Sequence, residues 1–198
     1  MLLDNIADIK TGIVLTRKKA EIDYNVKAKY RLITLKNIND DGTFNDESID
    51  TFDSNDILSP NYFTEEGDIV IRLSHPHTAV YIEKSHAGLL VPSYFAIIKI
   101  DKVKCLPEFI AWYLNTEQVK KELERSQAGS RIPTTNKNVL KMITLQDVPI
   151  AKQEALIQLL KLHQREKKLY QMLIDEKEQL FKGITDKIIQ GETKEEIR

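Results

Sequence analysis

The sequence predicts an α+β fold: a mixed-sheet domain over residues 1–149, a long projecting helix over residues 150–190 and a tail over residues 191–198. Two observations lead to this prediction. None of the six prolines lies after Pro149, and Gly183 is the only glycine in the helical range, where apolar residues recur at helical spacing. The earlier residues contain short alternating or apolar runs between turn residues, which is the pattern of strands.

The elements of the first domain follow from these runs, after a mixed stretch of about 30 residues. Strands are predicted over residues 30–35, 69–73, 79–82, 88–91, 94–100 and 142–145. Residues 39–42 (NDDG) and 66–68 (EGD) predict tight turns, and an acidic loop is expected between them. A single helix is predicted to begin at Pro107, since proline is tolerated in a first turn, and to end before Ala128. Residues 129–137 are expected to form a polar loop.

The helix over residues 150–190 carries an apolar stripe. At about 1.5 Å of rise per residue it would extend roughly 60 Å, so its own domain is too small to bury the stripe. We therefore expect a second copy of the helix as partner, in an antiparallel coiled coil, because a two-fold pair is isologous. Polar residues in the middle of the stripe would fix its register. The expected pairing residues are Leu156, Leu159, Leu160, His163, Tyr170, Leu173, Ile174, Leu180, Phe181 and Ile184.

The composition narrows the class of protein. The chain has 198 residues, of which 41% are hydrophobic and 30% charged, and residues 1–149 are enough for one domain with a core. No run is long and apolar enough to cross a membrane, and the first residues lack a signal-peptide pattern. Cys105 is the only cysteine, which excludes a disulfide framework and a cysteine metal cluster. We therefore expect a cytoplasmic protein.

The charges are unevenly distributed, although the formal net charge is only −1. Residues 1–38 hold eight Lys or Arg and four acidic residues, whereas residues 39–68 hold ten acidic residues and no Lys or Arg. Residues 69–149 hold eleven Lys or Arg and seven acidic residues. If the two basic segments meet in space, they form a basic face suited to nucleic acid. A surface whose charges are simply uneven is the alternative.

Signatures of catalysis are mostly missing. The seven glycines form neither GxGxxG nor GxxxxGK[ST], and GxSxG and HExxH are missing as well. His75 and His77 flank Pro76, and three interpretations of this pair are open: a metal site, polar side chains at the end of a strand, or contacts with a base edge. The strand end is favoured. No metal or other cofactor is expected.

Two polar segments hold side chains of the kinds that carry chemistry. A nuclease carboxylate cluster and an acidic surface loop both explain a group of acidic residues, and the missing lysine after them favours the loop. These residues are Asp53, Asp56, Glu66 and Asp68. Residues 129–137 (GSRIPTTNK) hold arginine, hydroxyl, amide and lysine side chains, which donate to phosphates and read base edges. A solvated connecting loop is the alternative for this segment.

Three segments of the first half match motifs of one known family. Residues 6–9 (IADI), followed by Gly12, resemble the opening of its recognition domain. Residues 35–38 (LKNI), followed by 41–42 (DG), resemble its "R/K-x-x-N-I … G" strand and turn. Residues 66–71 (EGDIVI) resemble the start of its "GDIL" strand.

Three segments of the second half resemble further motifs of the same family, in the same order along the chain. Residues 109–114 (FIAWYL) resemble an aromatic-rich helix, residues 129–140 a "G-S/T … N … L" loop, and residues 148–154 the "P-x-x-E-Q" start of a conserved helix. Together, the segments resemble the specificity (S) subunit of a type I restriction–modification system, in a half-length form. Two features depart from the family: the order Gln153-Glu154 is reversed, and a full S subunit carries two recognition domains and two helices.

The resemblance implies a non-catalytic subunit that reads half of a split target on double-stranded DNA. Such a subunit positions methyltransferase (M) subunits and, in complete systems, restriction (R) subunits. A half-length form rebuilds the full arrangement by self-association, so we expect a homodimer that reads an interrupted palindrome. The near-neutral charge predicts weak DNA binding by this chain alone.

Basic, amide and hydroxyl side chains of the recognition domain are expected to contact DNA. They are Arg17, Lys18, Lys19, Lys36, Arg72, Ser74, His75, His77, Arg131, Thr134, Thr135, Asn136 and Lys137. Three alternatives stay open: a coiled-coil adaptor that recognises a protein, an enzyme with an unfamiliar site, and a recognition module of another DNA-modification or phage-defence system.

Overall fold

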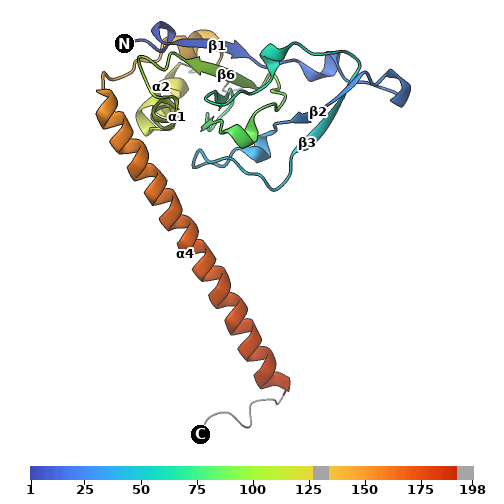
Figure 1. The fold of residues 1–198 in the computed structure, drawn as a ribbon, viewed down its shortest axis with the longest axis vertical. Helices are drawn as coiled ribbons and strands as arrows, with labels where there is room; N and C mark the ends of the chain where they lie inside the picture. The colour runs from blue at the N-terminus through green and yellow to red at the C-terminus, as the bar shows by residue number, and fades with distance from the viewer. Residues whose placement is uncertain (127–133, 191–198) are drawn as a thin grey trace. The chain divides into compact units, whose positions relative to one another are not determined.

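The computed structural model describes residues 1–126 and 134–190, and it confirms the α+β prediction (Figure 1). The chain divides into two compact units, Met1–Glu154 and Ala155–Arg198. The first unit holds the strands and the short helices, and the described part of the second is a single helix. Within the described ranges, none of the helices combines the length and the apolar composition that crossing a membrane requires.

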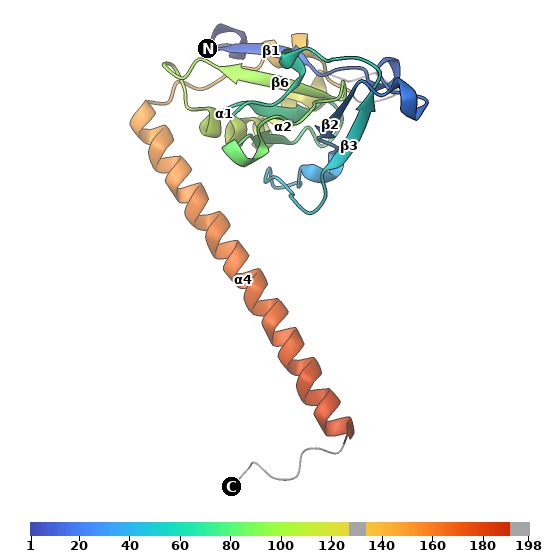
Figure 2. The same ribbon diagram turned by 45° about the vertical axis from the view of Figure 1, so that its right-hand side comes forward.

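A four-stranded antiparallel sheet forms the centre of the first unit (Figure 2). Its strand order is β1 (Ala7–Thr11), β6 (Phe95–Ile100), β4 (Ile69–Arg72) and β5 (Ala79–Tyr81). The central strand β6 pairs Ile98 with Ile9 on one side and with Ile69 on the other. Strands β4 and β6 are almost entirely buried, which is why continuous apolar runs predicted them. Strand β1 was not predicted, because only one of its five residues is buried.

A second, two-stranded sheet pairs β2 (Ala28–Leu32) with β3 (Asp50–Ser54) in antiparallel orientation. Strand β3 corrects the acidic loop that we expected for these residues. Phe52 and Ser54 are buried, whereas Asp50 and Asp53 are only half-buried, so the alternation of the strand rests on two residues. In Figures 1 and 2, this sheet lies on the opposite side of the unit from α1 (Pro107–Leu114).

The single helix predicted from Pro107 to just before Ala128 is interrupted after α1, and α2 (Glu117–Arg125) follows. Asn115 accounts for the break. Its side chain accepts a hydrogen bond from the Ala79 amide at 2.9 Å and donates one to the Ala79 carbonyl at 2.7 Å, which ties the end of α1 to β5. A sequence pattern does not contain this tertiary contact.

A third short helix, α3 (Lys137–Lys141), begins where the polar loop was expected to end. The Asn136 side chain caps it by accepting hydrogen bonds from the amides of Asn138 and Val139. Short 3-10 helices occur elsewhere in the described connections, at Leu3–Asn5, Leu15–Arg17, Asp23–Asn25, Leu35–Asn37, Pro60–Tyr62 and Lys84–His86.

The predicted strands over residues 88–91 and 142–145 form only isolated bridges. Thr144 bridges Leu2, and Leu90 bridges both Leu32 and Phe63. Residues 88–91 contribute to packing instead, since Leu90 packs in one core cluster while its neighbours Leu89 and Val91 pack in another. The segment therefore joins these two clusters.

Gly12 lies against the same part of the chain. Its amide donates to the Phe95 carbonyl at 3.0 Å, and a β-carbon added to it would lie 2.2 Å from the Pro92 carbonyl oxygen. This close approach of two backbone segments leaves room for glycine alone. The glycine of the opening motif thus has a packing role.

The long helix α4 (Ile150–Gln190) has the range that the sequence predicts. Its first turn belongs to the first unit, where Gln153 is buried. The Gln153 side chain accepts from the Leu106 amide at 2.9 Å and donates to the Val148 carbonyl at 2.7 Å. It also approaches the Cys105 sulfur at 3.9 Å, and burial raises the pKa of that thiol. Gln153 thus ties the start of α4 to the backbone at Leu106 and Val148.

Candidate nucleic-acid interface

The structure brings one group of predicted contact residues together, at the tip between β4 and β5. Ser74 forms an antiparallel bridge with Thr134, and the Thr135 amide donates to the Leu73 carbonyl at 2.7 Å. The tip is therefore joined to the segment that leads into α3. Arg131, which was predicted for the same site, lies outside the described residues.

The two histidines of the tip have different environments. His75 is exposed, and its Nδ1 lies 3.6 Å from the carboxylate of Glu124 in α2. His77 is buried in a left-handed backbone conformation, and its ring meets the ring of His75 edge-on at 6.3 Å. Of the two, only His75 is placed to meet a macromolecule. In the described parts of the chain, no three His, Cys, Asp or Glu residues form a group able to hold a metal ion.

The residues around the start of α3 also differ in their exposure to solvent. Thr135 is buried, whereas Thr134, Asn136 and Lys137 are exposed. The Asn136 side-chain oxygen serves the helix cap by accepting from the amides of Asn138 and Val139. Lys137 borders a depression of about 380 Å³ that Thr11 and Asn61 also line. Strand β1 and the turn at Pro60–Tyr62 therefore contribute polar groups that the sequence did not single out.

Arg72 has an internal role that the sequence did not reveal. Its guanidinium donates to the main-chain carbonyls of Leu35 and Ile38, and it lies 3.7 Å from Asp40. The side chain is only 12% exposed. Arg72 thus fixes the turn over Leu35–Asn37 and does not face solvent, so we remove it from the candidate DNA contacts.

The same turn is held from within by Asn37, which is fully buried. Its side-chain oxygen accepts from Thr34, and its amide donates to the carbonyls of Asn45 at 3.1 Å and Ser48 at 2.8 Å. Lys36 lies on the outside of the turn and forms an ion pair with Asp50 at 2.6 Å. The predicted contact residue Lys36 is thus accessible but already paired.

The cluster Arg17, Lys18 and Lys19 lies along β3. Lys19 bridges Ser54, and the Asn55 amide donates to the Lys18 carbonyl at 2.9 Å. The Lys18 ammonium donates a hydrogen bond to the Asp56 carboxylate at 2.6 Å and lowers the pKa of that carboxyl. Arg17 and Lys19 are exposed.

The acidic block is therefore not separate from the first basic segment. Three of its carboxylates, on Asp50, Asp53 and Asp56, pair with three lysines of residues 1–38. The cluster at 17–19 and the tip at 74–77 belong to different sheets. The two basic groups that would have formed a single face are thus carried by different sheets.

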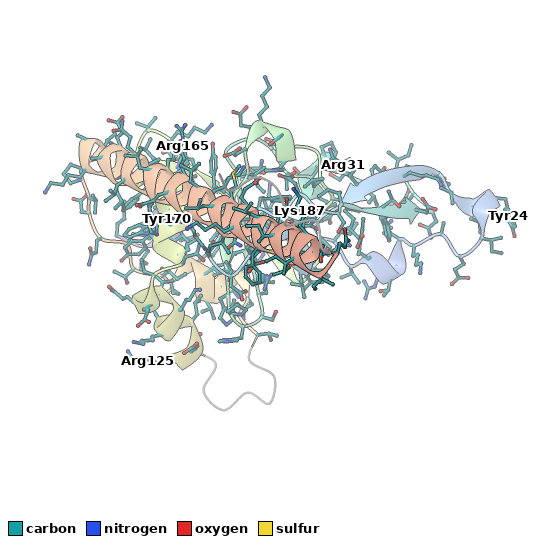
Figure 3. The ribbon with its side chains drawn as sticks, turned by 90° about the horizontal axis from the view of Figure 1, so that it is seen from below. Tyr24, Arg31, Arg125, Arg165, Tyr170 and Lys187 are labelled. Carbon is teal, nitrogen blue, oxygen red and sulfur yellow. The ribbon has the colours of Figure 1, made fainter. Side chains whose placement is uncertain are left out.

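Sequence reasoning missed a further group of cations on β2. Lys29 and Arg31 are exposed, and Lys27 lines a depression of about 470 Å³ with Tyr24 and Asn55. The two-stranded sheet of β2 and β3 is called the β2–β3 ribbon below. Figure 3 shows Tyr24 at the free end of this ribbon and Arg31 nearer the body of the unit. The signal was present, because exposed Lys29 and Arg31 alternate with the apolar residues of the strand.

Comparisons with known proteins were made by sequence and by structure. No protein-family model matches the sequence, and the search of the curated proteins found no match. A chain solved in work on complex assembly and conformational transition of the type I R-M system is 13% identical with a TM-score of 0.67. The match covers 98% of this chain and 48% of that chain.

Two further structures agree. The HsdS subunit from Thermoanaerobacter tengcongensis is 13% identical with a TM-score of 0.63, over 87% of this chain and 43% of that chain. The type I restriction–modification S subunit from M. genitalium is 15% identical with a TM-score of 0.52, over 98% and 46%. This chain spans about half the length of the structures that it matches. It has the fold of type I restriction–modification S subunits, as the motifs predicted.

Proposed function

We propose that this protein is a non-catalytic DNA-recognition subunit of a type I restriction–modification system. Its first unit reads one half of a split target on double-stranded DNA, and the protein positions methyltransferase subunits and, in a complete system, restriction subunits. The protein acts in the cytoplasm and requires no cofactor of its own. One observation carries the proposal: the chain has the S-subunit fold over about half the length of the structures that it matches, and it carries a 41-residue helix on which many apolar side chains are exposed.

The second half of the proposed assembly is a second copy of the chain. The exposed residues of α4 include Leu159, Leu173, Ile174, Leu180, Phe181 and Ile184. Apolar side chains at these spacings gain free energy when a partner helix covers them. A two-fold axis makes the pair antiparallel and gives it two identical DNA readers. The expected target is an interrupted palindrome.

The midpoint of α4 gives this pairing a sharp test. Position 170 lies halfway between Ile150 and Gln190, and Tyr170 is 59% exposed on the apolar stripe. If two antiparallel copies of α4 overlap along their whole length, Tyr170 of one chain lies close to Tyr170 of the other chain. Since Cys105 is the only native cysteine and is buried, a Tyr170→Cys variant offers one accessible thiol per chain.

We expect light scattering to give the mass of a dimer, and mild oxidation to crosslink Tyr170→Cys. The control is Lys168→Cys, which the helical period places on the opposite face and which should crosslink poorly. A monomer whose mass does not change with concentration would contradict the homodimer.

The recognition role requires a second experiment, in a host that carries the complete system. Deleting the gene should abolish methylation at an interrupted palindrome, and restoring it should bring the same motif back in long-read methylome sequencing. Exposed residues at the tip are the candidates for base contacts: His75, Thr134, Asn136 and Lys137. An unchanged methylome would favour the coiled-coil adaptor that recognises a protein.

A further inference from the structure

We propose that the outward face of the β2–β3 ribbon is a second DNA-contacting surface, with Lys27, Lys29 and Arg31 as its phosphate-binding cations. The inference rests on the proposed function, namely that the first unit binds double-stranded DNA. None of these three residues belongs to the contacts expected from the sequence.

The register of the ribbon separates an inward and an outward face. Tyr30 pairs with Phe52 and points inward, where its ring meets Phe63 at 5.0 Å and its hydroxyl accepts from the Leu58 amide at 3.0 Å. Side chains alternate along a strand, so Lys29 and Arg31 point to the other face. Both are exposed, in agreement with this alternation.

The partners across the ribbon leave these cations available. Arg31 lies opposite Thr51, which carries no charge. Lys29 lies opposite Asp53 at 3.5 Å, with 72% and 40% of the two side chains exposed. Exposed pairs of this kind contribute little to stability, so a phosphate oxygen can take the place of the carboxylate.

The free end of the ribbon adds amide and aromatic groups. Lys27 lines the depression of about 470 Å³ together with Tyr24, Asn25, Asn55 and Asp56. The Lys27 amide donates to the Ser54 carbonyl at 2.8 Å, so this residue continues the pairing of β2 with β3 beyond the strand. Asparagine amides and tyrosine hydroxyls are groups that also contact the DNA backbone and bases.

The size of the ribbon suits a duplex. The major groove of B-DNA is about 12 Å wide and admits a two-stranded ribbon. Residues 27, 29 and 31 are two apart, so they recur about every 6.7 Å and span roughly 13 Å along one edge. Three cations in a row on an otherwise near-neutral protein are expected to follow the phosphates and not to select bases.

The test uses the full-length chain assembled with the methyltransferase subunit of its system, and a long mixed-sequence duplex as the probe. The triple variant Lys27→Ala, Lys29→Ala and Arg31→Ala should weaken binding equally on all sequences. Each lost phosphate contact lowers the slope of log K against log salt by about 0.9, so we expect a decrease of about 2.7. A second variant, Asp53→Asn, removes the competing carboxylate and should tighten binding.

The matched control removes the same charge from exposed lysines outside the ribbon, with Lys84→Ala, Lys102→Ala and Lys152→Ala. It should leave the salt slope within one contact of the unaltered protein. Circular dichroism and urea unfolding of both triple variants check that the fold is retained.

The outcomes separate the two proposals. If the unaltered complex does not bind DNA, the proposed function fails. If the unaltered complex binds but the ribbon variant keeps the slope of the control, the ribbon inference is overturned while the function stands. If the ribbon variant keeps its fold but fails to assemble with the methyltransferase, the face binds an acidic protein surface, which also overturns the inference.

Discussion

Replacing Leu173 and Leu180 with alanine tests the pairing of α4 directly. The two side chains are 52% and 64% exposed, and they lie one heptad apart on the apolar stripe. Alanine has the highest helix propensity, so the helix of each chain should persist. The variant therefore removes the apolar surface of the interface without breaking the element that carries it.

The magnitude follows from the exposed fraction. Burying a leucine completely is worth about 1.5–3 kcal/mol, so the exposed half of each side chain has about 1 kcal/mol left to gain. Two positions in each of two copies give about 4 kcal/mol, which weakens the dimer roughly a thousandfold. Sedimentation velocity over a dilution series measures this change.

A control pair and a refuting result complete the design. Lys168→Ala and Lys182→Ala lie on the opposite face by the helical period and should leave the dimer within a fewfold of the parent. If the leucine variant associates as tightly as this control, the stripe does not form the interface and the antiparallel pairing is wrong.

Three more predictions concern the first unit. Arg72→Met should destabilise it by about 1.5–3 kcal/mol in urea unfolding, because two main-chain carbonyls lose a charged donor, and a loss below about 0.5 kcal/mol would refute the internal role of Arg72. Gly12→Ala should cost about 1–3 kcal/mol or more, since its β-carbon would overlap the Pro92 carbonyl, and a melting temperature equal to that of the parent would contradict this packing. Burial raises the pKa of the Cys105 thiol, so less thiolate is present at any pH than in free cysteine, and alkylation should be slow at pH 8 until the protein unfolds. Gln153→Ala should speed this alkylation, and equal rates in both proteins would show that the glutamine does not close the site.

The sequence predicted the elements whose own residues carry a clear pattern. Strands β4 and β6 are apolar runs, and α4 is a long periodic segment without proline. Strand β3 was missed because four of its five residues are polar, so only Phe52 marks it as apolar. The break between α1 and α2 depends on Asn115 reaching the backbone of β5, and local periodicity does not report such a contact.

The candidate interface was predicted less completely for a similar reason. Composition identified cations and amides, but not their partners. Arginine is a residue type that often contacts DNA. The Arg72 side chain instead donates to a main-chain carbonyl of this protein, whereas the Arg31 side chain faces solvent. Residue type does not distinguish the two, whereas the tertiary contacts and the exposure of each side chain do.

The pairing of Lys18, Lys29 and Lys36 with nearby carboxylates has a consequence for how such a protein would search a genome. Each pair acts as an internal competitor that a random duplex has to displace before it gains a phosphate contact. Incorrect sites would then be released quickly, and residence would lengthen only where base contacts add to the exchange. The cost of displacing the carboxylates is the same at every site, so discrimination would still come from the base contacts, while rapid release from random duplex would shorten the search.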